Sequence, residues 1–440
     1  MKRINIITLF MAGIFSSSML HAQETLTLQE AVQFALENKA EAKKSRLDVE
    51  NAQYQIDEVR AGALPQINGS ASLKYNAIIP SMPIDMNGQT TYLKMGQPWN
   101  STAALSVNQQ IFNQSLFTGL KAARTTREFY AINHQLTEEQ LIEKVANSYY
   151  DVYTTQLQLQ TIEDNLNSTT KTRDVISGLV TAGLGRKIDL DRTNVAINNL
   201  QANRQIIVNA LELKENALKF AIGMPMETDI VLPNETFAID ASLASAAGYD
   251  LAARSEIKVL EKQNELLELN RESMKADYYP RLSFGGDLGY QGFGQGFPVG
   301  GNFNWFGSSG LGLNLSIPIF NGGATKAKIN QATIKIKQAQ VDLEDTKLAL
   351  NLANENARAQ IKNSLLTVDQ NRRNVQLAKE VMDDTQNNYR NGLATLTELL
   401  DAENAYADAQ NNLNTSLLNY KVAEVQLIKA NGNLKSLVNE

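Results

Sequence analysis

The chain has 440 residues, of which 43% are hydrophobic and 7% aromatic, and its net charge is −6. This hydrophobic content is too low for a helical membrane protein, and an acidic chain without a basic run is a poor candidate for nucleic acid binding. The absence of cysteine excludes disulfides and thiolate metal sites.

The first 22 residues have the pattern of a secretory signal peptide. Lys2 and Arg3 form a positive start, residues 4–19 are mostly apolar, and Ala22 could precede a cleavage site. A membrane anchor is the alternative, but the apolar run is short for a transmembrane helix. We therefore expect an exported protein that begins near residue 23.

Two similar halves follow, because the same short motifs return in the same order about 209 residues later. Gly183-Leu184-Gly185 returns as Gly392-Leu393-Ala394, and Ile111-Phe112-Asn113 returns as Ile319-Phe320-Asn321. A repeat of this kind indicates two copies of one structural unit. We expect a first repeat over 23–224, a linker over 225–245 and a second repeat over 246–440.

Very long helices are expected in both halves. Residues 99–224 and 319–440 contain no proline, which would break a helix. Apolar or small residues in the second half alternate in steps of three and four, as in a coiled coil: Ile329, Ala332, Ile336, Ala339, Leu343, Thr346, Leu350 and Ala353. We predict long helices over about 114–182 and 321–390, with shorter ones over 27–60, 185–222, 246–277 and 394–431.

Four segments of about ten residues alternate between apolar and polar side chains, which is a strand period. They are residues 66–77, 101–112, 281–291 and 309–319, and the connections 78–100 and 292–304 are predicted to be long exposed loops. One apolar and one polar face is typical of transmembrane barrel strands, although a half-buried sheet has the same pattern. We favour the barrel, and four strands cannot close one alone. A dimer would give eight strands without a useful lumen, whereas a trimer gives twelve around a channel.

The whole pattern resembles the TolC-like outer-membrane efflux protein family. The most specific stretch runs from Tyr389 through Gly392 and Glu398 to Asn404, and its first-half counterpart is Gly183 to Asp189. The resemblance implies a mainly helical fold with transmembrane β-structure, in which a homotrimer shares an α-barrel and a 12-stranded β-barrel. It also implies a channel in the outer membrane lipid that works with a periplasmic adaptor, or membrane fusion protein, and an inner-membrane transporter. The exported cargo would be small molecules or proteins.

The resemblance also assigns residues to a periplasmic gate. Glu398 and Asp401 match the acidic rings at the entrance, while Tyr389 and Asp189 match a pair that holds it shut. The arginine that reinforces closure in the family falls at Ala394, so Arg390 or Arg186 is expected to take its place. Gly183 and Gly392 are expected at the hairpin turns.

The residues themselves leave alternatives open for this gate. Glu398 and Asp401 lie three apart on one helix face, and a trimer would bring six carboxylates together. Thr395 to Glu398 also fits a capping box, which would explain Glu398 without any gate. Tyr389 could equally serve in packing.

A trimeric coiled-coil stalk without a pore is the main alternative to the channel. The repeated strand and helix pattern favours the channel. An enzyme is not expected, because no nucleophile and base, cofactor motif or metal-ligand cluster emerges. We interpret His134 and the Glu138-Glu139 pair as residues on solvated helix faces.

Overall fold

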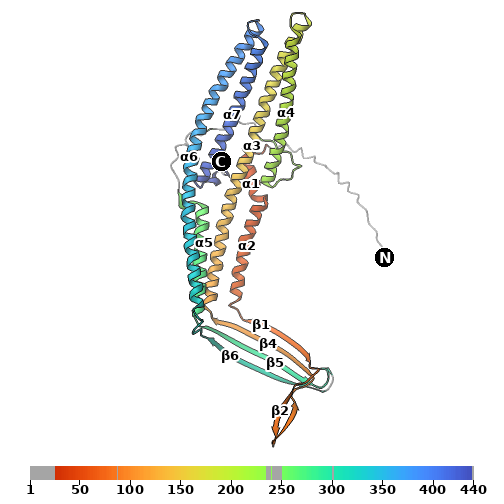
Figure 1. The fold of residues 1–440 in the computed structure, drawn as a ribbon, viewed down its shortest axis with the longest axis vertical. Helices are drawn as coiled ribbons and strands as arrows, with labels where there is room; N and C mark the ends of the chain where they lie inside the picture. Colours follow the sequence, from red (N-terminus) through yellow and green to blue (C-terminus); the bar gives the residue numbers. More distant parts are fainter. Residues whose placement is uncertain (1–24, 87, 234–238, 240–249, 300–301, 439–440) are drawn as a thin grey trace, which may run out of the picture.

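The computed structural model describes residues 25–86, 88–233, 239, 250–299 and 302–438. The expected signal peptide lies outside the described residues, and of the expected linker 225–245 only 225–233 and 239 are described. The molecule is elongated, with a bundle of long helices at one end and a sheet at the other (Figure 1).

Each half contributes short helices near its start and a long hairpin of helices. In the first half these are α1 (Leu28–Asn38), α2 (Ala40–Ala61), α3 (Gln114–Thr181) and α4 (Lys187–Ile222). In the second half they are α5 (Ser255–Lys275), α6 (Ala324–Arg390) and α7 (Leu396–Ala430), with short 3-10 turns η2 (Leu251–Ala253), η3 (Ala276–Tyr278) and η4 (Leu434–Val438). The expected helix over 27–60 is thus divided at Lys39, which has an extended backbone between α1 and α2.

The helix α3 has 68 residues and α6 has 67, so each is about 100 Å long at ~1.5 Å per residue. Both run from the sheet to the far tips of the hairpins (Figure 1). Contacts between neighbours give the order α2–α3–α5–α6 near the sheet and α4–α3–α7–α6 towards the tips. The helices therefore form one curved layer whose two open edges are α2 with α4 on one side and α6 on the other.

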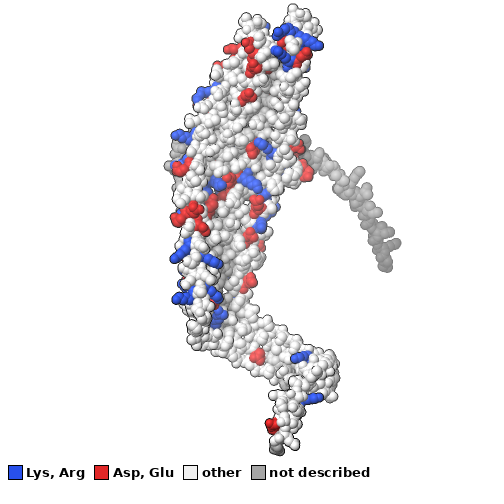
Figure 2. All heavy atoms as spheres, in the orientation of Figure 1, with Lys and Arg blue, Asp and Glu red and all other residues white. Residues whose placement is uncertain are grey.

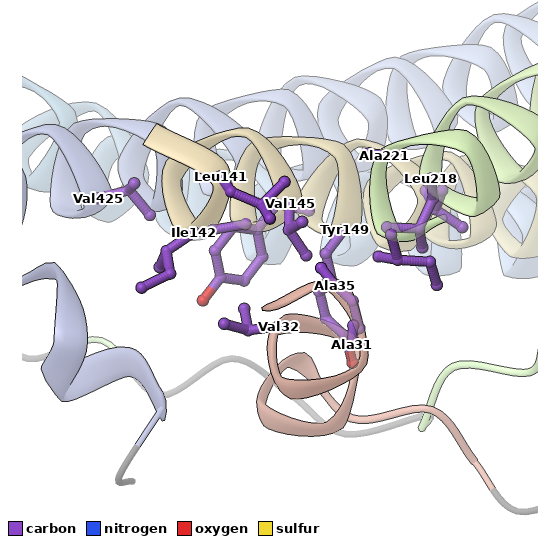
Figure 3. Close-up of a cluster of buried hydrophobic side chains, with 14 of the residues drawn as sticks. Ala31, Val32, Ala35, Leu141, Ile142, Val145, Tyr149, Leu218, Ala221 and Val425 are labelled. Atoms are coloured by element: carbon purple, nitrogen blue, oxygen red, sulfur yellow. The ribbon is translucent and has the colours of Figure 1, made fainter. Parts of the chain in front are cut away.

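The largest apolar core lies halfway along this layer, where α1 covers α3 and α4. Ala31, Val32 and Ala35 of α1 face Leu141, Ile142, Val145 and Tyr149 of α3 and Leu218 and Ala221 of α4 (Figure 3). Thr27 and Glu30 form a capping box that fixes the start of α1. This cluster joins the upper hairpins to the helices below them.

The sheet contains four antiparallel strands in the order β1-β4-β5-β6. Their bounds are β1 (Gln66–Tyr75), β4 (Trp99–Phe112), β5 (Arg281–Gly294) and β6 (Phe303–Ser316). The predicted segment 309–319 differs most, since β6 starts six residues earlier and ends three earlier. The predicted loop 78–100 contains a separate exposed hairpin of β2 (Ser81–Met86) and β3 (Gln89–Lys94).

The pairing register places most of the large apolar residues of the four strands on one face. Ile67 lies opposite Val107, Leu105 opposite Leu288, and Phe284 opposite Leu313. No described helix covers this face: Leu311 is 81% exposed and Ile67 69%. The strands β4 and β6 contain no charged residue, and the visible side of the sheet is almost free of charge (Figure 2).

Two buried cations make equivalent contacts in the two repeats, each with the C-terminal end of the last long helix of its repeat. Nζ of Lys39, just before α2, donates to the carbonyl oxygen of Phe220 at the end of α4 at 2.5 Å. The guanidinium of Arg254, just before α5, donates to the carbonyl oxygen of Lys429 at the end of α7. Each cation therefore satisfies a carbonyl at a helix C-terminus, where the helix dipole favours positive charge.

The interpretation of His134 and Glu138-Glu139 as solvated residues was wrong. His134 is half-buried, with Nδ1 at 2.8 Å from Oγ of Ser45 and Nε2 at 3.3 Å from a carboxylate oxygen of Glu138. Glu139 accepts a hydrogen bond from Ser255, and Glu138 pairs with Lys435. These glutamates bind α3 to the second repeat, a role that the helical pattern alone did not reveal.

None of the helices within the described residues has a segment long and apolar enough to cross a lipid bilayer.

Candidate functional site: the tips of the helical hairpins

The two hairpins end in turns of the same construction. Gly183 and Gly392 follow the long helices α3 and α6 with φ of 75° and 74°, a left-handed conformation that favours glycine. The amide of Leu184 donates to the carbonyl of Leu179, and that of Leu393 donates to Asn388, each at 2.8 Å. These bonds complete Schellman motifs, so both glycines lie at the turns where the sequence predicted them.

The carboxylate of Glu398 takes part in a capping box at the start of α7. Its Oε2 accepts from the backbone amide of Thr395 at 2.7 Å and from the Thr395 hydroxyl at 3.0 Å. These hydrogen bonds lower the pKa of Glu398. Asp401 lies one turn further on, and both side chains are exposed. The capping role of Glu398 is therefore present, and it leaves both acids at the solvated surface of the tip.

Arg186 is the arginine that binds Asp189. Its Nε and one terminal nitrogen donate to the two carboxylate oxygens of Asp189 at 2.8 and 3.0 Å. The charges of both residues affect Tyr389. Burial raises the pKa of Tyr389, the Asp189 carboxylate raises it further, and the Arg186 guanidinium lowers it. Tyr389 of α6 is thus within electrostatic range of Asp189 and Arg186 at the tip of the other hairpin.

Within the described residues, Arg390 forms no salt bridge with Asp189. It is exposed and lines a shallow pocket between α3 and α6 together with Lys171, Gln386 and Tyr389. Of the two arginines considered as substitutes for the one missing at Ala394, Arg186 is the one that binds Asp189.

Two further contacts join the hairpins to each other. Arg192 of α4 donates to the hydroxyl of Thr397 of α7 at 3.3 Å. Glu403 of α7, only 3% exposed, accepts hydrogen bonds from three hydroxyl groups of α3: Ser168, Thr169 and Thr172. Sequence reasoning missed Glu403, although a signal existed. Glu403 follows Leu396, Leu399 and Ala402 along the buried seam of α7, where a carboxylate is out of place.

The two edges of the helical layer carry exposed apolar stripes. On α6 the residues of the stripe are separated by four, seven, eleven or fourteen positions, which keeps them on one face of the helix. They are Ile334, Val341, Leu348, Leu352, Leu366, Leu377 and Val381. On the opposite edge, similar stripes follow α2 and α4: Leu47, Tyr54, Ile188, Val195, Ile206, Leu213 and Phe220. The buried residues of α6, such as Ile336 and Ile361, lie on its other side. Each edge helix is therefore apolar on two faces, of which one packs within the chain and the other has no cover from the described residues.

Within the described residues, no group of three or more His, Cys, Asp or Glu side chains has the arrangement of a metal site. The tips contain acids, an arginine pair and hydroxyls, but no histidine or cysteine.

Long paired helices and a four-stranded sheet with an exposed apolar face together define a duplicated, mainly helical fold. Solved structures share this fold. The outer membrane protein VceC from Vibrio cholerae superimposes with a TM-score of 0.72 at 18% identity, covering 92% of this chain and 96% of its own. The Campylobacter jejuni CmeC outer membrane channel gives 0.71 at 17% identity, covering 98% and 94%.

Comparison of the sequence with profiles of known protein families identifies the family of this chain. The profile of the family described as "Outer membrane efflux protein" matches residues 31–224 and 250–433, most of the chain. The chain therefore belongs to the outer membrane efflux protein family. The predicted TolC-like fold, mainly helical with a small sheet, and the outer-membrane location are thereby confirmed.

Curated relatives are similar over most of their length. Outer membrane protein TolC of Salmonella enteritidis is 23% identical over 437 residues, covering 96% of this chain and 85% of the relative. Alkaline protease secretion protein AprF of Pseudomonas aeruginosa is 22% identical over 337 residues, covering 74% and 68%. These relatives are named for the outer membrane and for secretion, and the family for efflux.

Proposed function

We propose that this protein is the outer-membrane exit duct of a tripartite efflux or type I secretion system, and that it works as a homotrimer. The observation that carries the proposal is that the sheet and the helical layer are open on the same two sides. The edge strands β1 and β6 continue into the edge helices α2 and α6, respectively. A second copy could pair with the strand and cover the apolar stripe at once, which favours a closed ring of identical subunits.

The sheet has the features of a wall between lipid and water. Its exposed apolar face suits hydrocarbon, and its other face carries residues such as Asn68, Ser106 and Asn314. Aromatic side chains gather at the end far from the helices, where Tyr75 and Trp99 lie 4.8 Å apart and Trp99 and Phe297 lie 5.2 Å apart. An aromatic band at a membrane boundary is typical of outer-membrane strands. Three copies would supply the twelve strands of a β-barrel with an open lumen.

The helices would then stand in the periplasm, with their tips towards the inner membrane. A periplasmic adaptor and an inner-membrane transporter are the partners that this placement and the efflux family name favour. The duct would be passive, with no enzymatic activity of its own. The stalk alternative is less favoured, because a stalk has no need for a sheet with one apolar and one polar face.

A direct test is electrical. The purified full chain in planar lipid bilayers is expected to give discrete single-channel currents, because a water-filled lumen conducts ions. Trimers that insert into the bilayer without any conductance, under a range of voltages, would instead support the stalk.

We further propose that Glu398 and Asp401 form acidic rings at the periplasmic entrance, and that Tyr389 and Asp189 contribute to its closed state. Replacing Glu398 by Gln and Asp401 by Asn together is expected to lower the preference for cations, because six carboxylates leave the opening. Reversal potentials in a salt gradient measure this preference. Glu380→Gln, at another exposed acid of α6, is the control and should leave the potential unchanged. Equal potentials for the double variant and the wild type would contradict the assignment.

A further inference from the structure

A buried carboxylate joins the two hairpins just behind their tips. Oε1 of Glu403 accepts from Oγ of Ser168 at 3.0 Å and from Oγ1 of Thr172 at 3.3 Å, and Oε2 accepts from Oγ1 of Thr169 at 3.1 Å. The donors come from successive turns of α3, whereas Glu403 lies near the start of α7. One side chain therefore bonds the second hairpin to the first at three points.

The environment of this carboxylate is unusual for a structural acid. Burial raises the pKa of Glu403, and the hydrogen bonds from the three neutral hydroxyls offset this only in part. A cavity of about 200 Å³ lies beside it, lined by Asp164 and Asn165 of α3, Met382 of α6 and Tyr406 of α7. Water could therefore reach the carboxylate if α7 moved away from α3.

The position of Glu403 links it to the entrance. Asp401 lies two residues before it on α7, and Glu398 lies five residues before it. Any separation of α7 from α3 at Glu403 must therefore move both acids. In the described part of the chain, another side-chain hydrogen bond between these helices runs from Asn414 to Thr161 at 3.2 Å, about three turns further from the tip.

We propose that Glu403 is a positioning residue of the gate, which holds the start of α7 against α3 when the entrance is closed and is hydrated when it opens. The inference rests on the proposed channel function. In the closed state the hydroxyls of Ser168, Thr169 and Thr172 hold the carboxyl in place. In the open state water replaces them, and the pKa of the carboxyl falls towards that of an exposed glutamate. Opening therefore lowers the pKa of Glu403.

The sign of the pH dependence follows from this coupling. The pKa of Glu403 is higher in the closed state than in the open state, so the closed state binds the proton more tightly and acid favours closure. The titratable groups that line the same cavity or its continuation towards the tip are Asp164 and Lys171 on α3, Tyr389 and Arg390 on α6, and Tyr406 on α7. They are unchanged in a Glu403 variant, so a comparison of pH profiles isolates the contribution of Glu403.

The test compares single-channel recordings of the full-length trimer with Glu403→Leu, Glu403→Gln and the control Asn414→Leu. Glu403→Leu is expected to raise the open probability about tenfold, because the closed state alone loses its hydrogen bonds to the carboxylate. Glu403→Gln keeps an acceptor oxygen and cannot ionise, so it should stay mostly closed and lose the rise in open probability at higher pH. Asn414→Leu should change the open probability far less.

The possible outcomes distinguish failure of the gate role of Glu403 from failure of the proposed channel function. Currents from the wild type, with equal open probability and the same pH profile in all Glu403 variants, would overturn the gate role of Glu403 and leave the channel function intact. Absence of current from every protein, the wild type included, would reject the channel. If Glu403→Leu does not assemble, the Ser168→Ala and Thr172→Ala double variant removes two donors with little change in volume, and its open probability decides the question.

Discussion

Replacement of Val341 by Glu is expected to leave the purified protein monomeric in detergent. Val341 belongs to the apolar stripe on the outer edge of α6 and is 68% exposed in the single chain. In the proposed trimer this stripe packs against α2 and α4 of the next subunit. The substitution would bury an unpaired carboxylate at each of three interfaces, and an unpaired buried charge costs several kcal/mol.

The adjacent residue offers a matched control. Gln340 is also exposed, and it precedes Val341 by one residue, so its side chain points about 100° away around the helix. Gln340→Glu adds the same charge away from the stripe and should leave the trimer intact. Light scattering coupled to size exclusion gives the mass of each variant. A stable Val341→Glu trimer would show that this edge of α6 is not a subunit interface.

The long helices could be predicted from the sequence because their cause is local. The absence of proline and the steps of three and four persist over whole helices, and the structure places α3 and α6 within three residues of the predicted limits. The break at Lys39 could not be predicted in this way. It depends on Phe220, whose carbonyl oxygen accepts from Lys39 across the fold.

The strands were harder to delimit than the helices. β6 starts at Phe303, inside a glycine-rich stretch that reads as a loop, because its pairing with Gly294 extends the sheet beyond the alternating segment. The hairpin of β2 and β3 was missed, although its turn glycine, Gly88, has a φ of 78°. A turn signal in a polar and proline-rich segment does not by itself show that the flanking residues pair.

At the hairpin tips, the turns and the capping box could be predicted from the sequence, because they depend only on residues that are close along the chain. The contacts between the hairpins could not. Arg186 and Arg390 were both candidates in the sequence, and the pair that forms, Arg186 with Asp189, is a local one within the first hairpin. The position of Glu403 on the buried side of α7 follows from the helical pattern, but its three hydroxyl partners on α3 are known only from the fold.

Replacement of Arg254 by Met is expected to destabilise the second repeat by about 3–5 kcal/mol, the usual cost of removing one partner from a buried charged contact. Arg254 is 4% exposed. It binds the carbonyl of Lys429 at the end of α7 and both carboxylate oxygens of Glu256, at 3.1 and 2.6 Å. Without it, a helix C-terminus and a carboxylate lose their buried partner together.

The pH dependence of this loss tests its cause. Burial alone raises the pKa of Glu256, but the hydrogen bonds from Arg254 and from the helix amide outweigh it and the pKa is lowered. In the wild type the contact therefore stabilises the fold above the usual glutamate pKa and weakens as the pH falls. In Arg254→Met only the helix amide and the charge of Lys429 still oppose the effect of burial, so the pKa of Glu256 should rise, which favours its neutral form. The difference in stability between the two proteins is thus largest near neutral pH and narrows towards pH ~4.

Hydrogen exchange is the suitable measurement, because it reports the end of α7 and the start of α5 separately from trimer dissociation. Arg254→Lys should recover part of the protection, since Lys39 makes the equivalent contact in the first repeat. Lys262 of α5 is a more exposed cation that pairs with Glu128 of α3 and Glu265 of α5. Lys262→Met should therefore cost less than about 1 kcal/mol. If Arg254→Met and Lys262→Met exchange alike at all pH values, the buried cation is not what closes the repeat.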